Sequence, residues 1–253
     1  MSRPVRVHEV RVDGQPLICR LHGRGPLCVV HPSMPGGYLR MPLAERELTM
    51  AYLDGPASAE HLHAVIEHLA GDPVFLLGHG SGGFAAQKYA LAHPDRPAGL
   101  ILYSTGAVAD AAAARDRLRD YAVANAYAPA LAAWDRRRPE DLFPAYFADY
   151  WRRKAEFEPV RDRMRAWPLP AAPFDVRAAL PSITTPTLVL AGAHDPFFPP
   201  AAADTLHDGI PGARLAVFRH SAHLAHLEES ERFTHLLLEF TRRLAGPYRA
   251  PRR

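Results

Sequence analysis

The chain has 253 residues, of which 48% are hydrophobic and 23% charged, a balance that is ordinary for one globular domain. No apolar run is long enough to span a bilayer, and the N-terminus lacks the apolar segment of a signal peptide, so we expect a cytoplasmic protein. The net charge of +3 comes without a basic stripe interleaved with aromatic residues, so we expect neither nucleic acid nor membrane as a partner. Cys19 and Cys28 are expected to be reduced and buried.

Strand and helix signals alternate along the N-terminal half of the chain. Apolar residues on both sides of Asp13-Gly14 predict a hairpin, because this dipeptide favours a tight turn. Helical spacing of apolar residues after Ser58, a candidate N-cap, predicts a helix near 62–69, and a second helix is expected over 83–92. Continuous apolar runs predict buried strands over 27–30, 48–53, 74–77 and 100–103.

The alternation is interrupted and then resumes. Residues 107–181 have a helical composition rich in aromatic residues, and we expect them to form a helical cap (lid) over the carboxyl ends of the strands. Residues 1–106 and 182–253 then form the core, with strands 187–191 and 215–218 and helices near 201–206 and 233–240. This pattern predicts an α/β fold with a mostly parallel sheet and helices on both faces.

The chemistry is concentrated in three segments. Gly78-His79-Gly80-Ser81-Gly82 follows a buried strand and opens a helix, which is the setting of the nucleophile elbow Gly-x-Ser-x-Gly. Gly80 stands at the nucleophile position of that elbow. Asp195 follows strand 187–191 and His223 follows strand 215–218. The order elbow, acid, histidine, each at the end of a strand, predicts that Asp195 and His223 form an acid–base pair.

Together these segments make the chain resemble an α/β-hydrolase of the prolyl-iminopeptidase-like branch over about residues 17–244, with 31–37 similar to the oxyanion loop of that branch. The resemblance implies Asp195 as the acid and His223 as the base. It implies the Ser81 N–H as one oxyanion donor and Ser33 or Met34 as the source of the other. We expect a substrate pocket for an apolar or aromatic small molecule, with the candidate lining residues His31, His79, Trp134, Tyr146, Tyr150, Trp151 and Phe197.

Gly80 leaves the reaction class open. Glycine adopts the positive-φ backbone of an elbow at little cost, so the loop can keep its shape without a nucleophile. The first hypothesis is non-covalent acid–base chemistry by His223 and Asp195, as in a cyclase, a lyase, an isomerase or a water-mediated hydrolase. The second is a serine hydrolase, an esterase or aminopeptidase, whose serine has been replaced by Gly80. The third is a catalytically inactive protein that binds a small molecule.

Other candidate sites are disfavoured. Ser81 is an unfavourable nucleophile because the bulky His79 stands where an elbow needs a small residue, and we expect its hydroxyl to hydrogen-bond in the first helical turn. His220, His223 and His226 are spaced by three, but His223 has a role in the fold already, so we expect no metal and no cofactor. The arginine-rich runs 136–138 and 152–154 are predicted to be solvated helix faces. The oligomeric state is unknown.

Overall fold

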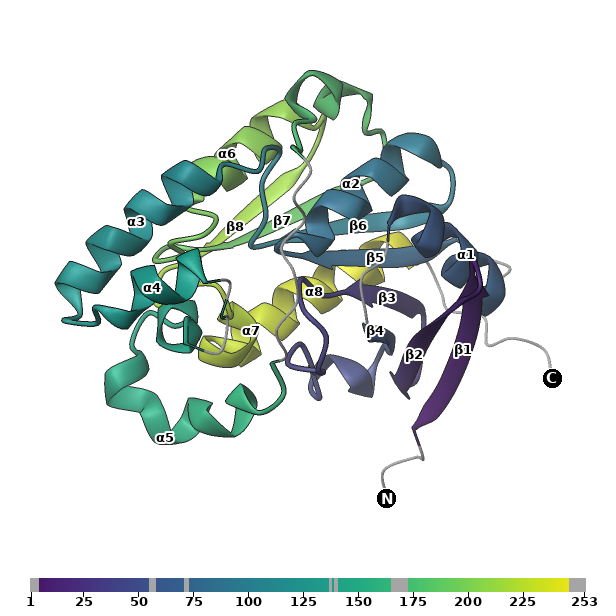
Figure 1. Ribbon diagram of the computed structural model, residues 1–253. Helices are drawn as coiled ribbons and strands as arrows, with labels where there is room; N and C mark the ends of the chain where they lie inside the picture. The colour runs from purple at the N-terminus through teal and green to yellow at the C-terminus, as the bar shows by residue number, and fades with distance from the viewer. Residues whose placement is uncertain are drawn as a thin grey trace.

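The computed structural model describes residues 5–54, 58–70, 73–136, 138, 141–164 and 173–245. Within these residues one sheet has the order β1-β2-β4-β3-β5-β6-β7-β8 (Figure 1). The antiparallel β2 joins β1 to β4, and all pairings from β4 to β8 are parallel. The strands are β1 (Arg6–Val12), β2 (Gln15–Gly23), β3 (Leu27–His31), β4 (Thr49–Asp54), β5 (Val74–His79), β6 (Pro97–Tyr103), β7 (Thr187–Gly192) and β8 (Arg214–Phe218). The predicted mostly parallel sheet is therefore confirmed.

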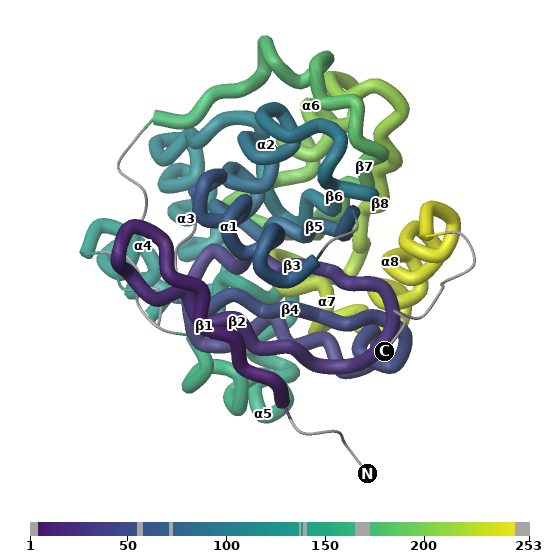
Figure 2. The backbone as a smooth tube through the Cα atoms, turned by 90° about the vertical axis from the view of Figure 1, so that its right-hand side faces the viewer, coloured from purple at the N-terminus to yellow at the C-terminus, as the bar shows by residue number. Residues whose placement is uncertain are grey.

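Helices cover both faces of this sheet, as predicted. Figure 2 shows α8 on the opposite side of the sheet from α1, α2 and α6. The helices are α1 (Ala59–Leu69), α2 (Gly82–Ala92), α3 (Ala111–Ala124), α4 (Pro129–Asp135), α5 (Tyr150–Arg161), α6 (Pro200–Gly209), α7 (Ala225–Glu228) and α8 (Ser230–Ala245). Short 3₁₀ helices are η1 (Ala44–Arg46), η2 (Phe143–Tyr146) and η3 (Arg177–Ser182).

The two faces of the sheet build two hydrophobic layers because successive strand residues point to opposite sides. Leu76 and Leu100 face the layer that contains α1, α2 and α6. Leu77 and Ile101 face the layer that contains α8 and much of the segment between β6 and β7. Strands buried on both faces are continuous apolar runs, and this explains why the sequence pattern located them.

Two local signals are confirmed at the N-terminal end of the fold. Asp13 and Gly14 both have positive φ, +51° and +75°, as a tight hairpin turn between β1 and β2 requires. Ser58 caps α1, where its hydroxyl oxygen accepts a hydrogen bond from the His61 N–H at 3.3 Å. Cys19 and Cys28 are buried free thiols, and burial raises the pKa of each to about 12.

The segment between β6 and β7, called the insertion here (residues 104–186), contains α3, α4, η2, α5 and η3. In Figure 1 α3, α4 and α5 lie together beyond one end of the sheet. The predicted cap range 107–181 includes residues outside the described ranges, namely 137, 139–140 and 165–172. The boundaries 107 and 181 remain predictions, because nothing in the fold divides the chain there into separate units.

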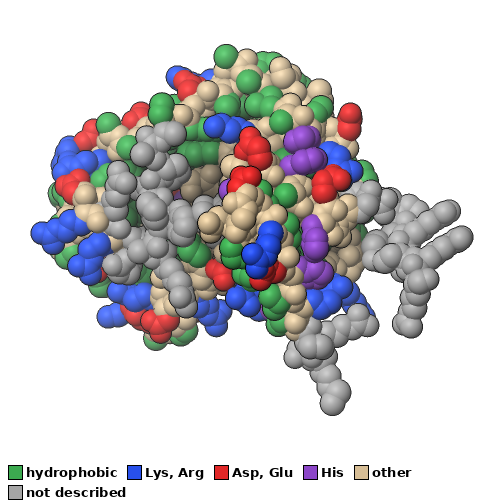
Figure 3. Space-filling view, turned by 45° about the vertical axis from the view of Figure 1, so that its right-hand side comes forward, with side chains coloured by type: hydrophobic (Ala, Val, Ile, Leu, Met, Phe, Trp, Pro, Cys, Tyr) green, Lys and Arg blue, Asp and Glu red, His purple; other side chains and the backbone are tan. Residues whose placement is uncertain are grey.

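Most charges of the insertion are exposed and paired with one another. Arg115 bonds to Asp135 at 2.8 Å, and the two arginine-rich runs include the ion pairs Arg138 with Asp141, Arg152 with Asp149 and Arg153 with Glu156. Figure 3 shows acidic and basic side chains mixed over one face of the molecule. Such exposed pairs contribute little to stability, and they leave no single-sign patch among these residues. None of the described helices has the length and apolar character that crossing a membrane requires.

Candidate active site

The turn between β5 and α2 has the geometry of a nucleophile elbow. Gly80 has φ +55°, and its carbonyl oxygen accepts a hydrogen bond from the Thr105 hydroxyl at 2.7 Å. A Cβ atom on Gly80 would point toward His223 and lie 3.4 Å from Nε2. A Cβ on Gly78 would come within 2.6 Å of the Gly83 Cα, so strand and helix touch here through glycine. The elbow therefore places its central residue next to His223, although that residue carries no side chain.

Asp195 and His223 form a buried pair beside the elbow. His223 Nδ1 lies 2.8 Å from Asp195 Oδ2, and the two side chains are 4% and 0% exposed. Asp195 Oδ1 accepts hydrogen bonds from the N–H groups of Phe197 at 2.8 Å and Phe198 at 3.1 Å. A carboxylate acceptor at Nδ1 places the imidazole hydrogen there, so Nε2 presents its lone pair toward Gly80. The structure thus brings together the three positions that the sequence placed at the centre of the chemistry.

The loop that carries His223 is anchored to the insertion by Glu228. Glu228 Oε2 accepts from the Ala222 N–H and Oε1 accepts from the Ala148 N–H, both at 2.8 Å. The Tyr146 carbonyl oxygen accepts from the His223 N–H at 3.1 Å. Burial raises the pKa of Glu228 to about 7, although the hydrogen bonds it accepts and the nearby Arg153 charge both lower it. One carboxylate therefore ties the histidine loop to the segment between η2 and α5.

His79, at the end of β5, contacts the backbone of His223. Its Nε2 lies 3.1 Å from the His223 carbonyl oxygen, and its Nδ1 lies 3.0 Å from the Tyr38 hydroxyl. The ring is fully buried, and burial together with the neighbouring His223 lowers the pKa of His79 well below its usual value. His79 is therefore neutral and acts as a fixed hydrogen-bonding element beneath the elbow.

The oxyanion loop does not offer the Ser33 N–H as a second donor. The Ser33 N–H donates to the Tyr38 hydroxyl at 3.0 Å. Met34 accepts a hydrogen bond at Sδ from the Tyr146 hydroxyl at 3.9 Å. Because the loop after β3 folds back onto Tyr38, the Ser33 amide is not directed at a substrate oxygen, and Met34 as the source of the second donor stays a prediction.

The Ser81 N–H stays a prediction as an oxyanion donor. Ser81 precedes α2 in helical conformation, and no acceptor for its N–H is found among the described residues. Such an amide at the start of a helix favours a negative charge. The expected bond from its hydroxyl to the first helical turn is absent there, since Ser81 has φ −65° and ψ −22° instead of the extended backbone of a capping residue.

Aromatic rings surround His223. The ring centroids of Phe197, Tyr146 and Phe198 lie 5.2, 5.4 and 6.0 Å from that of His223. Trp134 stacks on Phe197 at 6.1 Å. These rings come from the loop after β7, from η2 and from α4, so the predicted pocket residues Trp134, Tyr146 and Phe197 meet at the site. They form an apolar wall beside the acid–base pair.

The structure does not bring Tyr150 and Trp151 together with the other predicted pocket residues. The Tyr150 ring packs against Phe143 and Phe147 inside the insertion, and its hydroxyl bonds to Glu158. Trp151 is 48% exposed. Both residues belong to the first turn of α5. The aromatic composition of the insertion did not show which of its rings face His223.

The remaining histidines of the prediction have structural roles. His31 is buried at the end of β3, and its Nδ1 donates to the Pro32 carbonyl oxygen at 2.8 Å. His226 uses both ring nitrogens, with Nδ1 3.0 Å from the Tyr103 hydroxyl and Nε2 3.1 Å from the Tyr38 carbonyl oxygen. Burial lowers the pKa of His226 to about 4. Among the described residues no cluster of three or more metal-ligating side chains is found.

Three contributors were not identified from the sequence. Tyr38 follows two glycines in a loop, where a single tyrosine has no periodic signal. Phe198 is adjacent to the predicted Phe197. Glu228 belongs to the segment that carried the family resemblance, yet its bond across to the insertion depends on how the two segments fold together.

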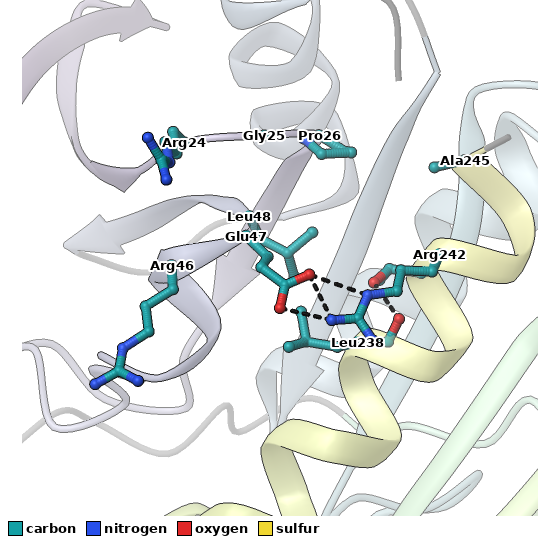
Figure 4. Close-up of a pocket in the computed structure, with 10 residues that line it drawn as sticks. Arg24, Gly25, Pro26, Arg46, Glu47, Leu48, Leu238, Arg242 and Ala245 are labelled. Atoms are coloured by element: carbon teal, nitrogen blue, oxygen red, sulfur yellow. Dashed lines mark hydrogen bonds and ion pairs between the residues drawn. The ribbon is translucent and has the colours of Figure 1, made fainter. Parts of the chain in front are cut away.

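A cavity of about 410 Å³ lies away from this site, between the turn before β3, η1 and α8 (Figure 4). It contains an ion pair in which Nε and Nη2 of Arg242 bond to the carboxylate of Glu47. None of the residues of the acid–base pair or the elbow lines this cavity.

Comparisons with known proteins agree on the family. The model of the alpha/beta hydrolase family matches residues 15–236. A protein named as a carbamate hydrolase, RutD, of Variovorax paradoxus is 31% identical over 68% of this chain and 67% of its own length. A 2-hydroxy-6-oxononadienedioate/2-hydroxy-6-oxononatrienedioate hydrolase of Klebsiella pneumoniae is 27% identical over 96% and 93%. A proline iminopeptidase of Saccharolobus solfataricus is 27% identical over 67% and 62%.

A solved structure shows the same fold. A thermophilic esterase from Thermogutta terrifontis superposes with a TM-score of 0.74 at 22% identity, covering 95% of this chain and 100% of that one. The relatives carry names of different reactions, so the prolyl-iminopeptidase-like branch remains one resemblance among several.

Proposed function

Because the chain belongs to the alpha/beta hydrolase family, we propose that it hydrolyses a small apolar or aromatic ester or related carbonyl compound without a covalent intermediate. His223, oriented by Asp195, takes a proton from water as the water oxygen bonds to the carbonyl carbon. The carbonyl electrons move to its oxygen, which the Ser81 N–H stabilises. The adduct then collapses, and His223 returns the proton to the leaving oxygen.

The observation that carries this proposal is the position of Gly80 next to the ring nitrogen Nε2 of His223. A Cβ at this position would lie 3.4 Å from His223 Nε2, yet glycine offers no oxygen that could form an acyl-enzyme. A base with a lone pair aimed at this point can activate a reactant other than the protein. Water is the reactant that hydrolysis requires, and two of the related proteins described above are named as hydrolases.

The substrate class follows from the aromatic wall. Tyr146, Phe197 and Phe198 offer apolar surface next to His223. Among the described residues, Arg117 is the one arginine bonded to the loop that follows Asp195. Its guanidinium donates to the carbonyl oxygens of Pro196 and Phe197 at 2.8 and 3.1 Å. A neutral substrate with an apolar or aromatic acyl group therefore suits the site better than an anionic one. The insertion would then act as the cap of this site.

A second candidate function is supported by the elbow itself. The positive φ of Gly80 and its position next to His223 are the geometry that a serine nucleophile needs, as in a serine hydrolase whose serine became glycine. In that case the present chain would bind the substrate and leave it unchanged, as would a catalytically inactive binding protein.

The first test is removal of the base. His223→Ala should lower the rate of hydrolysis of phenyl and 4-nitrophenyl esters of short-chain and aromatic acids by at least roughly 100-fold, because general base catalysis contributes about that much. The matched control is His220→Ala, which removes an exposed histidine of the same loop and should leave the rate unchanged. Equal hydrolysis by wild type and His223→Ala would contradict the proposal and favour the binding protein.

A further inference from the structure

Ser33 presents the polar side chain that is closest to the point where a nucleophile would stand. A Cβ on Gly80 would lie 3.1 Å from Ser33 Oγ and 3.4 Å from His223 Nε2. Those two atoms belong to the loop after β3 and to the histidine loop, and they flank the same position from two sides. A water molecule at this position would lie within hydrogen-bond reach of both His223 Nε2 and Ser33 Oγ.

The hydrogen-bond chain behind Ser33 decides which way its hydroxyl points. The His223 carbonyl oxygen can only accept, so His79 Nε2, 3.1 Å away, carries the hydrogen of that bond. The buried, neutral His79 then has a bare Nδ1, which accepts from the Tyr38 hydroxyl at 3.0 Å. With its own hydrogen committed to His79, the Tyr38 oxygen accepts from Ser33 Oγ at 2.8 Å, and its other lone pair accepts from the Ser33 N–H at 3.0 Å.

The alternative arrangement would have Ser33 donate directly to His79. That pair is 3.5 Å apart, against 3.0 Å for Tyr38 and His79, and hydrogen bonds weaken at the longer distance. The Ser33 hydrogen is therefore directed at Tyr38. The lone pairs of Ser33 Oγ that Tyr38 does not use are free to accept a hydrogen bond from a reactant near Gly80.

We propose that Ser33 orients the attacking water by accepting its second hydrogen while His223 accepts the first. This role rests on the proposed non-covalent hydrolysis. It is the opposite of the oxyanion role expected from the sequence, in which this residue donates to the substrate. Two acceptors hold both hydrogens of the water, so the remaining lone pair of the water oxygen is directed at the carbonyl carbon.

The proposal predicts a preference between nucleophiles. Water has two hydrogens to donate and methanol has one, so Ser33 favours water over methanol in the wild type. Ser33→Ala removes this acceptor, and the ratio of methyl ester to acid formed from a 4-nitrophenyl ester in aqueous methanol should rise roughly tenfold, the effect of about one hydrogen bond. The total rate should fall while KM changes little. Ser182→Ala, an exposed serine, is the control and should leave the ratio unchanged.

The product ratio separates the two roles of Ser33. If Ser33 donated to the oxyanion, its removal would slow attack by water and by methanol equally, so an unchanged ratio with retained hydrolysis would overturn this proposal alone. If His223→Ala and wild type hydrolysed the esters equally, the proposed function itself would fail. The two failures are therefore distinguishable in one set of assays.

A measurement that needs no turnover tests the hydrogen-bond chain. In the ¹⁵N spectrum of histidine-labelled protein, His79→Gln identifies the His79 signals by their loss. We expect the neutral tautomer with hydrogen on Nε2, unchanged in Ser33→Ala. Hydrogen on Nδ1 instead would mean that Tyr38 donates to Ser33, and it would overturn the acceptor role.

Discussion

Gly80 and Ser33 share one small volume, and this contact limits what a serine at the elbow could do. A Cβ on Gly80 would lie 2.9 Å from the Ser33 Cβ, closer than two such carbons normally approach. A residue other than glycine at φ +55° would add strain of about 1–3 kcal/mol. The oxyanion loop is therefore fitted to glycine, and a serine at position 80 requires that loop to move.

This contact predicts how a nucleophile can be restored. Gly80→Ser alone should react slowly with a fluorophosphonate probe, because the Ser33 side chain crowds the new residue. The double variant Gly80→Ser with Ser33→Gly relieves the contact, and it should be labelled roughly ten times faster or more, since overpacking of this kind costs about 1–3 kcal/mol. Intact-protein mass spectrometry measures both rates.

The matched control is Gly80→Ala with Ser33→Gly, which has the same backbone changes and no nucleophile, so it should remain unlabelled. Equal labelling rates for the single and double serine variants would show that Ser33 does not crowd position 80.

At the scale of elements, the active-site loops are held by the insertion as well as by the sheet. Glu228 bonds the histidine loop to the Ala148 N–H, and Arg117 of α3 bonds to the loop that carries Asp195. The base thus bonds directly to the segment between β6 and β7 through its N–H and the Tyr146 carbonyl oxygen, and the loop of the acid bonds to that segment through Arg117. The geometry of the pair depends on how the insertion packs, even though both residues follow core strands.

Glu228 also gives stability a pH dependence of known sign. Burial raises its pKa from 4.5 to about 7, so the folded state binds a proton that the unfolded state releases. The stability gained from this proton is complete below pH 4.5 and is lost as the pH rises toward 7. Glutamine does not titrate, so the free energy of unfolding of wild type minus that of Glu228→Gln should fall by up to about 3 kcal/mol between pH 4.5 and 8.

Urea denaturation at several pH values measures this difference. Glu229→Gln is the matched control of opposite sign, because hydrogen bonds from His220, Ser221 and Arg232 outweigh burial and lower the pKa of Glu229. Its difference from wild type should grow as the pH rises through the acid range. A Glu228→Gln difference that is constant from pH 4.5 to 8 would contradict the assignment.

For the whole molecule, the sequence was sufficient to predict the positions of those site residues that come directly after a buried strand. Buried strands are continuous apolar runs, and Gly80, Asp195 and His223 each come shortly after one, so their meeting at one edge of the sheet was predictable. The surroundings of Ser33 and Tyr150 were not predictable in this way. The direction of the Ser33 amide depends on Tyr38, and the orientation of Tyr150 depends on the packing of α5, and neither contact is visible in local spacing.

The central claim is that water attacks the substrate directly, with His223 as base and without an acyl-enzyme. It is tested most directly by the products formed in aqueous methanol from aryl esters of one acid with different leaving phenols. Direct attack predicts that the ratio of methyl ester to acid changes with the leaving phenol, because the phenol is still bound when the nucleophile attacks. A ratio that is the same for every phenol would reveal a common covalent intermediate and contradict the account.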